Sequence, residues 1–560
     1  MKRFLTVALL LCTILFSFSA CKKGSDNARH IPKEATAVVR IDMASIGKKL
    51  AMDMLFGSDV FKEMSKGAGK DSSAMQDIQN AGIDFLNTFY MYVVSDKRYS
   101  GDQKMVGLVP LSDDGKWEAY VKKTAPKAEI KTVDKRKECV LSDGMYAAWD
   151  ENLLVITNAI TIQSEMPFDE NGNYIAPQVD LAQTAAEMAN LFKMTKENSI
   201  AANNKFADME KEGNDVSIWV NYESVMNNYG RGMMGGFTPS NAMMKDAIMV
   251  SSLNFDKGAI NAEMKYYVSD EMKGVIKKFA DTKADKELVE RLPGNNLSAV
   301  AALSVPSKAM MEMLEKFGLL GLVNTGLAEA GTNMTAEEVF SAFTGDMGFA
   351  MNNFRIEQKK TEYTHFNDAG EMVTDSFTSS RPNMEWVYVL KIDKQDKFDK
   401  VLQYAAANNV ITSTGAGTYA VAGGEDAPQI IVKDKYLVVA NNAANANAYI
   451  AGSNKGQKMH EVASKEIYSH PMTMFFDIKQ MLNAGAAAMG DDADDAARMA
   501  ELQKTFDNVI FYGGEFKSDA YTYKASLNFV NKNENSLMQL INLGSKMSEI
   551  EKREDAVVAR

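Results

Sequence analysis

The stretch AIMVSSLNFDKGAINAEMKYYV, residues 247–268, decides the fold because its pattern returns in NVIFYGGEFKSDAYTYKASLNF, residues 508–529. From Ile260 to Val268 every second residue is apolar, and the later stretch keeps this alternation from Tyr521 to Phe529. A period of two is typical of a β-strand that buries one face. A short polar turn divides each stretch, so each predicts a β-hairpin. We therefore expect an internal duplication with an offset of 261 residues.

The elements before these hairpins also recur in one order. Ile31-Pro32 and Leu292-Pro293 each lead into an apolar strand, and helical segments, paired strands and a further hairpin follow in both halves. The pattern predicts an α+β fold of two tandem duplicated domains, each a mainly antiparallel sheet covered by helices. The acidic link 281–290 separates the domains. We assign a signal peptide to 1–20, a tether to 21–30, repeat domains to 31–280 and 291–545, and a solvated tail to 549–560.

Two low-complexity insertions precede the closing hairpins at equivalent places, YGRGMMGGFTPSNAMM at 229–244 and GAAAMGDDADDAARM at 485–499. Insertions at one position of a repeat emerge on equivalent faces, often the binding face. Methionine-rich segments can repack on a partner. The predicted partner contacts are Met233, Met234, Phe237 and Met489. The alternative is that the insertions form helical hairpins that bury these side chains within their own domain.

A third insertion occurs only in the second half. Residues 355–382 form a polar excursion between the predicted strands 347–353 and 385–392. Lengthening a surface hairpin costs little free energy, so the excursion is compatible with a duplication.

The N-terminus has the features of a signal peptide. Lys2 and Arg3 precede an apolar run that is too short for a comfortable membrane span, and Ser19-Ala20-Cys21 follows. This ending resembles a bacterial lipobox, which implies cleavage before Cys21 and attachment of diacylglycerol to its thiol. We expect the lipid at Cys21 to be the membrane attachment. The alternative is an ordinary secretory leader with a chance cysteine.

Composition narrows the possible partners. The net charge of −12 argues against nucleic-acid binding, which needs basic patches that neutralise phosphates. With Cys12 removed in the leader and Cys21 lipidated, Cys139 is the single remaining cysteine, so no internal disulfide is expected. Cys139 lies in an apolar run and is predicted to be buried and inert.

Recognisable catalytic motifs are absent from the sequence. The four histidines are far apart, and no zinc, EF-hand, phosphate-loop, dinucleotide or nucleophile-elbow motif occurs. Asp491, Asp492, Asp494 and Asp495 could hold a hard cation, although carboxylates at this spacing also favour the start of a helix. We therefore assign no catalytic, cofactor-binding or metal-binding residue, and no cofactor.

The Ser-Ala-Cys lipobox, the opening IPKEATAVV at 31–39 and the duplicated body resemble a family of large Bacteroidetes lipoproteins of unknown function. The resemblance implies a cell envelope with two membranes and gives no residue a role. Lipoproteins exported to the surface of such cells tend to carry acidic residues after the cysteine. Lys22-Lys23 at this position favour an outer-membrane location that faces the periplasm.

Two functions follow as expectations. The preferred one is a non-catalytic envelope lipoprotein that binds an envelope protein, glycan or other ligand through the insertions. The alternative is a hydrolase that acts on envelope glycans or peptides with a pair of carboxylates, which the 74 acidic residues neither reveal nor exclude. An enzyme should have a deep pocket with converging polar groups, and a binding protein should have exposed apolar loop tips.

Overall fold

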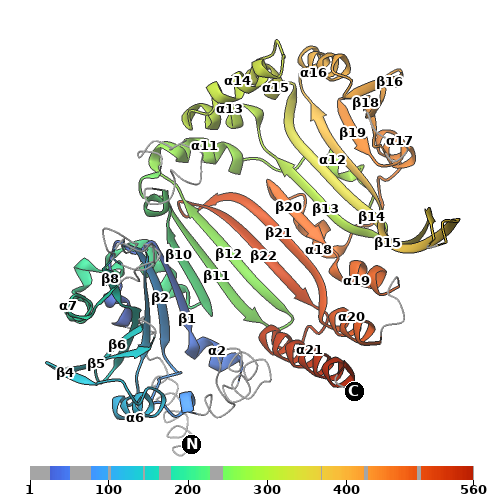
Figure 1. Cartoon of the computed structure of the whole chain (residues 1–560). Coiled ribbons are helices and arrows are strands. Elements are labelled where there is room, and N and C mark those ends of the chain that lie inside the picture. Colours follow the sequence, from blue (N-terminus) through green and yellow to red (C-terminus); the bar gives the residue numbers. More distant parts are fainter. Residues whose placement is uncertain are drawn as a thin grey trace, which may run out of the picture. The chain divides into compact units, whose positions relative to one another are not determined.

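The computed structural model describes residues 26–50, 77–96, 98, 103–142, 145–162, 178–226, 244–367, 369–421, 427–487 and 493–558. They belong to two compact units (Figure 1). Unit 1 falls within Met1–Lys48 and Ser73–Val220, and unit 2 falls within Lys49–Ser72 and Asn221–Arg560. Both units combine helices with mainly antiparallel strands, which confirms the predicted α+β class.

Unit 1 is built on an antiparallel sheet. The strands pair in the order β4 (Lys131–Val133), β5 (Arg136–Ser142), β6 (Met145–Trp149), β7 (Leu153–Asn158), β3 (Gln103–Pro110), β2 (Thr88–Ser95), β1 (Ala37–Asp42) and β10 (Val216–Asn221). A separate ladder joins β8 (Ile160–Ile162) to β9 (Gln178–Asp180).

The helical segments of unit 1 are η1 (Asp26–His30), α2 (Met43–Lys49), α6 (Asp114–Thr124), α7 (Leu181–Phe192), η3 (Lys196–Asn198), η4 (Ile200–Ala202) and α8 (Asn204–Glu212). Helix α6 begins where the Asp113 carboxylate accepts a hydrogen bond from the backbone N–H of Lys116. It packs Trp117 edge-on against Trp149 of the sheet, with ring centroids 6.5 Å apart. Cys139 lies in the same core and is 3% exposed, as predicted.

The sequence from Leu181 to Glu212 predicts one long helical stretch, but the structure divides it into two helices. Helix α7 ends at Phe192, and α8 starts only after Asn203, whose side chain accepts hydrogen bonds from the next helical N–H groups. An asparagine at a cap competes with continued helix, so the apolar periodicity on either side does not join into one helix.

Unit 2 contains a wider antiparallel sheet. The strands pair in the order β11 (Ile248–Asp256), β12 (Ala259–Tyr267), β22 (Ala520–Phe529), β21 (Phe506–Lys517), β20 (Met472–Phe476), β13 (Leu297–Ser304), β14 (Phe343–Phe366), β15 (Met372–Ile392), β19 (Tyr436–Ala440), β18 (Gln429–Lys433), β17 (Thr418–Val421) and β16 (Ile411–Gly415).

Both predicted hairpins are present in this sheet. Strands β11 and β12 are joined by Lys257 and Gly258, and Gly258 has a φ of +68°. Strands β21 and β22 are joined by Ser518 and Asp519, with φ of +48° and +65°. Positive φ in a two-residue loop matches the twist of the flanking strands. The hairpins also pair with each other through β12 and β22.

The helices of unit 2 are α11 (Asp270–Ala280), α12 (Lys286–Glu290), α13 (Ser307–Lys316), α14 (Leu320–Glu329), α15 (Ala336–Ser341), α16 (Gln395–Ala407), α17 (Ala443–Ala451), α18 (Glu461–Glu466), α19 (Ile478–Ala486), α20 (Ala493–Thr505) and α21 (Ser536–Val558). One sheet face forms the main core with α12, α17 and α18. Val300, Ala350, Val387 and Phe475 are almost fully buried there.

Two predicted boundaries, the tail from residue 549 and the domain link at 281–290, can be compared with the structure. The tail predicted from residue 549 begins inside a helix, because α21 continues to Val558 and Ile550 is only 3% exposed. Apolar residues at helical spacing, from Leu537 through Ile541 and Met547 to Ile550, extend the helix past the predicted end. The predicted domain boundary at 281–290 stays a prediction. The compact units are defined by contacts within the fold, and the β12–β22 ladder places β11 and β12 in unit 2 although they precede this boundary.

Candidate functional site

The sheet of unit 2 has a second apolar face opposite its main core. A row of directly opposed side chains crosses it from β11 to β15 without a charged residue. The row consists of Leu253, Ala262, Ala525, Phe511, Met474, Ala301, Phe349 and Tyr388. Neighbouring positions on this side are also apolar: Ile260, Met264, Tyr523, Leu527, Val509 and Phe476. We call these residues the open face.

The open face is only partly covered. Met264, Met474 and Phe476 are 37%, 36% and 41% exposed, and the other members are half-buried. At one end of the strands, α11 and α13 pack on Tyr266 and Tyr521. Helices α19, α20 and α21 lie at the opposite strand ends (Figure 1). Among the described residues, the middle of the face presents apolar side chains between these two groups of helices.

Strands β12 and β22 have one apolar side, which belongs to the open face, and one polar side. Their polar side carries Asn261, Glu263, Lys265 and Lys524, which is the composition of a solvated face. An antiparallel sheet with one polar face normally buries the other one. Ala262 and Ala525 oppose each other near the β11 end of the row, so the surface is lower there than at the longer side chains of Met264 and Ile260. Within the described ranges, the face is therefore a partly exposed apolar surface.

Unit 1 has a smaller apolar surface of the same kind. Val39 of β1 is opposed by Ile218 on one side and Met91 on the other, and these two residues are 37% and 45% exposed. Further along the same row Ala147 and Cys139 are buried under α6. The apolar face is thus covered at one end of the row and exposed at the other.

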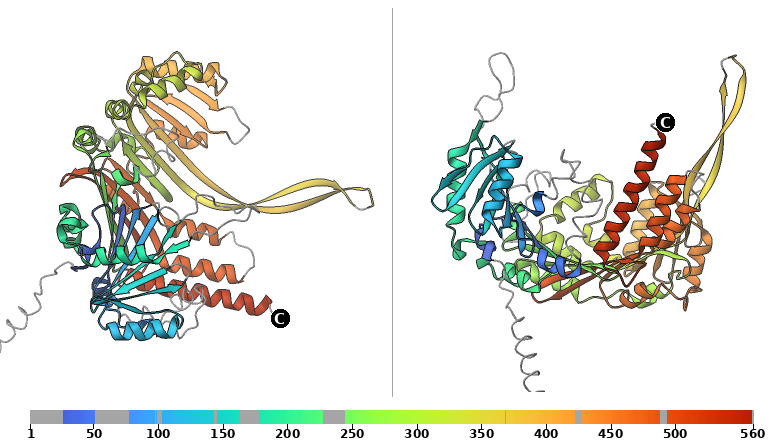
Figure 2. Two further views of the ribbon diagram at one scale, coloured as in Figure 1. Left: turned by 60° about the vertical axis from the view of Figure 1, so that its left-hand side comes forward. Right: turned by 90° about the horizontal axis from the view of Figure 1, so that it is seen from below.

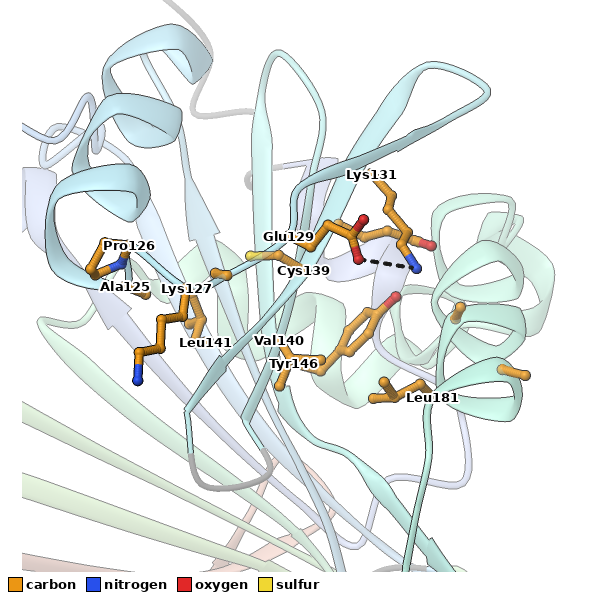
Figure 3. A pocket seen from close by; sticks show the side chains of 14 residues that line it. Ala125, Pro126, Lys127, Glu129, Lys131, Cys139, Val140, Leu141, Tyr146 and Leu181 are labelled. Carbon is orange, nitrogen blue, oxygen red and sulfur yellow. Dashed lines mark ion pairs between the residues drawn. The ribbon is translucent and has the colours of Figure 1, made fainter.

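A pocket in unit 1 lies beside β5 and β6 and has a volume of about 860 Å³ (Figure 3). Tyr146 and Leu181 project towards it, and Ala182 and Ala185 of α7 also line it. At its rim Glu129 and Lys131 form an ion pair of 3.8 Å. The lining combines apolar side chains with the charged groups of Lys127, Glu129, Lys131 and Glu138.

The chemistry of this pocket does not suit a nucleophilic enzyme. Burial raises the pKa of the Cys139 thiol to about 11, so the thiol is protonated at neutral pH. Burial and the neighbouring Glu138 carboxylate raise the pKa of Tyr146 well above its ordinary value. Glu138 itself is held by Arg136, with 3.1 Å between Oε2 and Nη2. Neither the Cys139 thiol nor the Tyr146 hydroxyl is therefore poised to give up a proton near neutral pH.

One histidine of unit 2 lies between two carboxylates. Nε2 of His470 is 2.9 Å from Glu466, and its Nδ1 contacts Glu515. Burial opposes ionisation of Glu515, but hydrogen bonds from Lys517 and His470 outweigh burial and lower its pKa. Both carboxylates are thus occupied by an internal imidazole. Among the described residues, no group of His, Cys, Asp and Glu is suited to hold a metal ion.

The residues predicted from sequence fall largely outside the described part of the chain. The residues outside the described part are Cys21, Met233, Met234, Phe237, Met489, Asp491 and Asp492. Asp494 and Asp495 begin α20, and Asp495 pairs with Arg498 at 3.0 Å. Their place in the first turn matches the helix-start alternative.

Sequence reasoning missed the open face although its signal was present. Strand β20 reads Met472-Thr473-Met474-Phe475-Phe476, and β13 is apolar at every position from Ala299 to Leu303, so both sides of these strands carry apolar side chains. Such runs predict burial on two faces. The sequence does not reveal which of the two faces lacks a covering helix.

The fold and the open face define a mixed α+β protein with a broad apolar sheet surface and no recognisable catalytic centre among the residues described. The chain belongs to the DUF4836 family, a domain of unknown function, whose model matches residues 28–378. No curated protein matches the chain. No helix in the described ranges combines the length and hydropathy needed to cross a bilayer.

Solved structures of a protein called TP0453 show weak similarity. Crystal form IV has 6% sequence identity and a TM-score of 0.27, and covers 44% of this chain and 83% of that one. Crystal form I has 5% identity and a TM-score of 0.26, and covers 47% of this chain and 89% of that one. TM-scores of this size do not establish a shared fold.

Proposed function

We propose that this chain is a non-catalytic lipoprotein of the bacterial cell envelope that binds the apolar chain of an envelope lipid on its open face. The exposed middle of that face is the observation that carries the proposal. Large apolar patches mark interaction sites on soluble proteins. A floor of methionine, alanine and aromatic side chains without charges favours an acyl chain over a glycan, which needs hydrogen-bonding partners.

The proposed address is the outer membrane of a cell of the Bacteroidetes type, with the protein facing the periplasm. Its support is the leader at 1–20, the Ser-Ala-Cys ending and Lys22-Lys23. Met233, Met234, Phe237 and Met489 stay predicted additional contacts for a partner in the envelope. The hydrolase alternative is not proposed, because the described residues offer no free carboxylate pair in a pocket that would support it.

We also infer that the chain arose by internal duplication. Support comes from two matching strand orders: β10, β1, β2, β3, β7, β6, β5, β4 and β20, β13, β14, β15, β19, β18, β17, β16. In the β12–β22 ladder Glu263 faces Lys524, and these residues are separated by the repeat offset of 261. A local twofold between two equivalent hairpins would produce this pairing.

Binding can be tested with the apolar dye N-phenyl-1-naphthylamine and its displacement by palmitic acid. We expect the parent to bind the dye, and Met474→Lys or Phe476→Lys to weaken binding at least about tenfold, since a lost apolar contact and a charge together exceed about 1.4 kcal/mol. Leu322→Lys is the matched control, because Leu322 is 67% exposed on α14, away from the face. Equal binding by all variants, or a parent that takes up no dye, would reject the open face as the site.

Lipidation has an independent test. Cys21→Ser should release the protein from the membrane fraction into the soluble fraction, because one diacylglycerol anchor is the proposed attachment. Mass spectrometry of the parent should find the lipid on the N-terminal residue of the mature chain. A variant that stays as firmly bound as the parent would show that the attachment lies elsewhere.

A further inference from the structure

Strands β14 and β15 continue beyond the rest of the unit 2 sheet as a two-stranded ribbon. Residues 355–366 pair with residues 372–383, whereas β13 and β19 pair only with the inner parts of these strands. A bulge between Asn352 and Arg355 marks the base. Figure 2 shows the ribbon reaching away from the other strands of its sheet. We call residues 355–382 the arm.

The end of the arm is rich in exposed apolar side chains. Tyr363, Phe366, Met372 and Phe377 are 47%, 68%, 68% and 52% exposed. The rings of Tyr363 and Phe377 lie 6.1 Å apart across the two strands. A two-stranded ribbon is marginally stable alone, and its unpaired edges are templates for another strand. The arm therefore has the features of a docking element.

Charge on the arm is divided along its length. The half near the base carries Arg355, Lys359, Lys360 and Arg381, with a single acid, Glu357, that pairs with Arg355 at 2.7 Å. The half near the tip carries Glu362, Glu371 and Asp375. Glu371 adjoins the tip turn, so a membrane would bury this carboxylate together with the aromatic rings, at high cost. The base half of a second arm offers the opposite charge instead.

We propose that two copies of this chain associate by pairing their arms along β14, antiparallel and centred on Thr361. This register places Lys360 opposite Glu362 of the second copy and Ile356 opposite its Phe366. Twofold symmetry makes each pair occur twice. A register centred on Lys360 would instead oppose two lysines, which is destabilising. On β15, Pro382 lacks an N–H, which disfavours pairing along that edge.

The first test is a charge swap measured by sedimentation velocity on the mature chain with Cys21→Ser. The parent should be a dimer. Lys360→Glu and Glu362→Lys should each weaken the dimer by about tenfold or more, since each alters two symmetric pairs, and the combined variant should restore it. Lys116→Glu is the matched control, because Lys116 and Lys360 are both 66% exposed and have an acid within 4 Å. A monomeric parent, or a double variant that stays weakened, overturns the proposal.

The second test reads the register directly. Thr361→Cys should form a covalent dimer under oxidation, because residues opposed at the axis bring their Cβ atoms within disulfide range. Ser380→Cys, an exposed position on β15, should remain monomeric, and the native Cys139 is buried. Equal crosslinking of both variants would exclude the proposed pairing even if the charge variants failed to fold.

Discussion

Arg40→Leu should destabilise unit 1 by about 3–5 kcal/mol, because it removes one partner from a buried ion pair. Nη2 of Arg40 lies 2.9 Å from Oδ2 of Asp42, and the two side chains are only 4% and 5% exposed. Nη1 also donates to the carbonyl of Asn214 at 3.1 Å. Without the guanidinium, the Asp42 charge stays in the protein interior, next to Ser45, which also bonds to the buried Asp215.

Urea unfolding followed by tryptophan emission can measure this change, since Trp117, Trp149 and Trp219 all lie in unit 1. Lys33→Leu is the control, because its pair with Glu34 spans 3.9 Å and both side chains are more than 60% exposed. A surface pair of this kind contributes at most about 1 kcal/mol. Arg40→Leu combined with Asp42→Leu should recover part of the lost stability. Equal shifts for the two single variants would contradict the prediction.

The strands of the closing hairpins could be predicted from sequence because their polarity alternates sharply. Ile260, Met264 and Tyr521 sit on one side of the sheet as expected. The expectation that this side is buried holds only partly, since α11 and α13 cover Tyr266 while Met264 remains 37% exposed. Alternation reports which face avoids water, and it carries no information about what covers that face.

The arm could not be predicted for a related reason. Residues 355–382 are polar at most positions, and a sequence method sees a loop where no buried face imposes a period of two. The ribbon is held by main-chain pairing that is continuous from Arg355 to Phe366. Only Tyr363, Phe366, Met372 and Phe377 hint at an interaction role, and they are separated by charged residues along the chain.

Gly345→Ala should destabilise unit 2 by about 3 kcal/mol or more, the combined cost of left-handed backbone strain and steric overlap. Gly345 has a φ of +98° at the irregular start of β14, and a Cβ there would overlap the carbonyl of Val305. The same two residues are tied by a hydrogen bond of 3.0 Å from the Val305 N–H to the Gly345 carbonyl. The Val305 carbonyl therefore cannot move away from an added Cβ without weakening this hydrogen bond.

Thermal unfolding of alanine variants at two other glycines can separate the cost of backbone strain from the cost of steric overlap. Gly331 has a φ of +77°, and no atom lies within 4 Å of the point that an added Cβ would occupy, so its alanine variant should lose only about 1 kcal/mol from strain. Gly326 lies within α14 with open space around it, and its alanine variant should gain up to about 1 kcal/mol from helix propensity. If Gly345→Ala lost no more stability than Gly331→Ala, the prediction would be wrong. The Val305 carbonyl would then move aside, and the start of β14 would deform more easily than its hydrogen bonding implies.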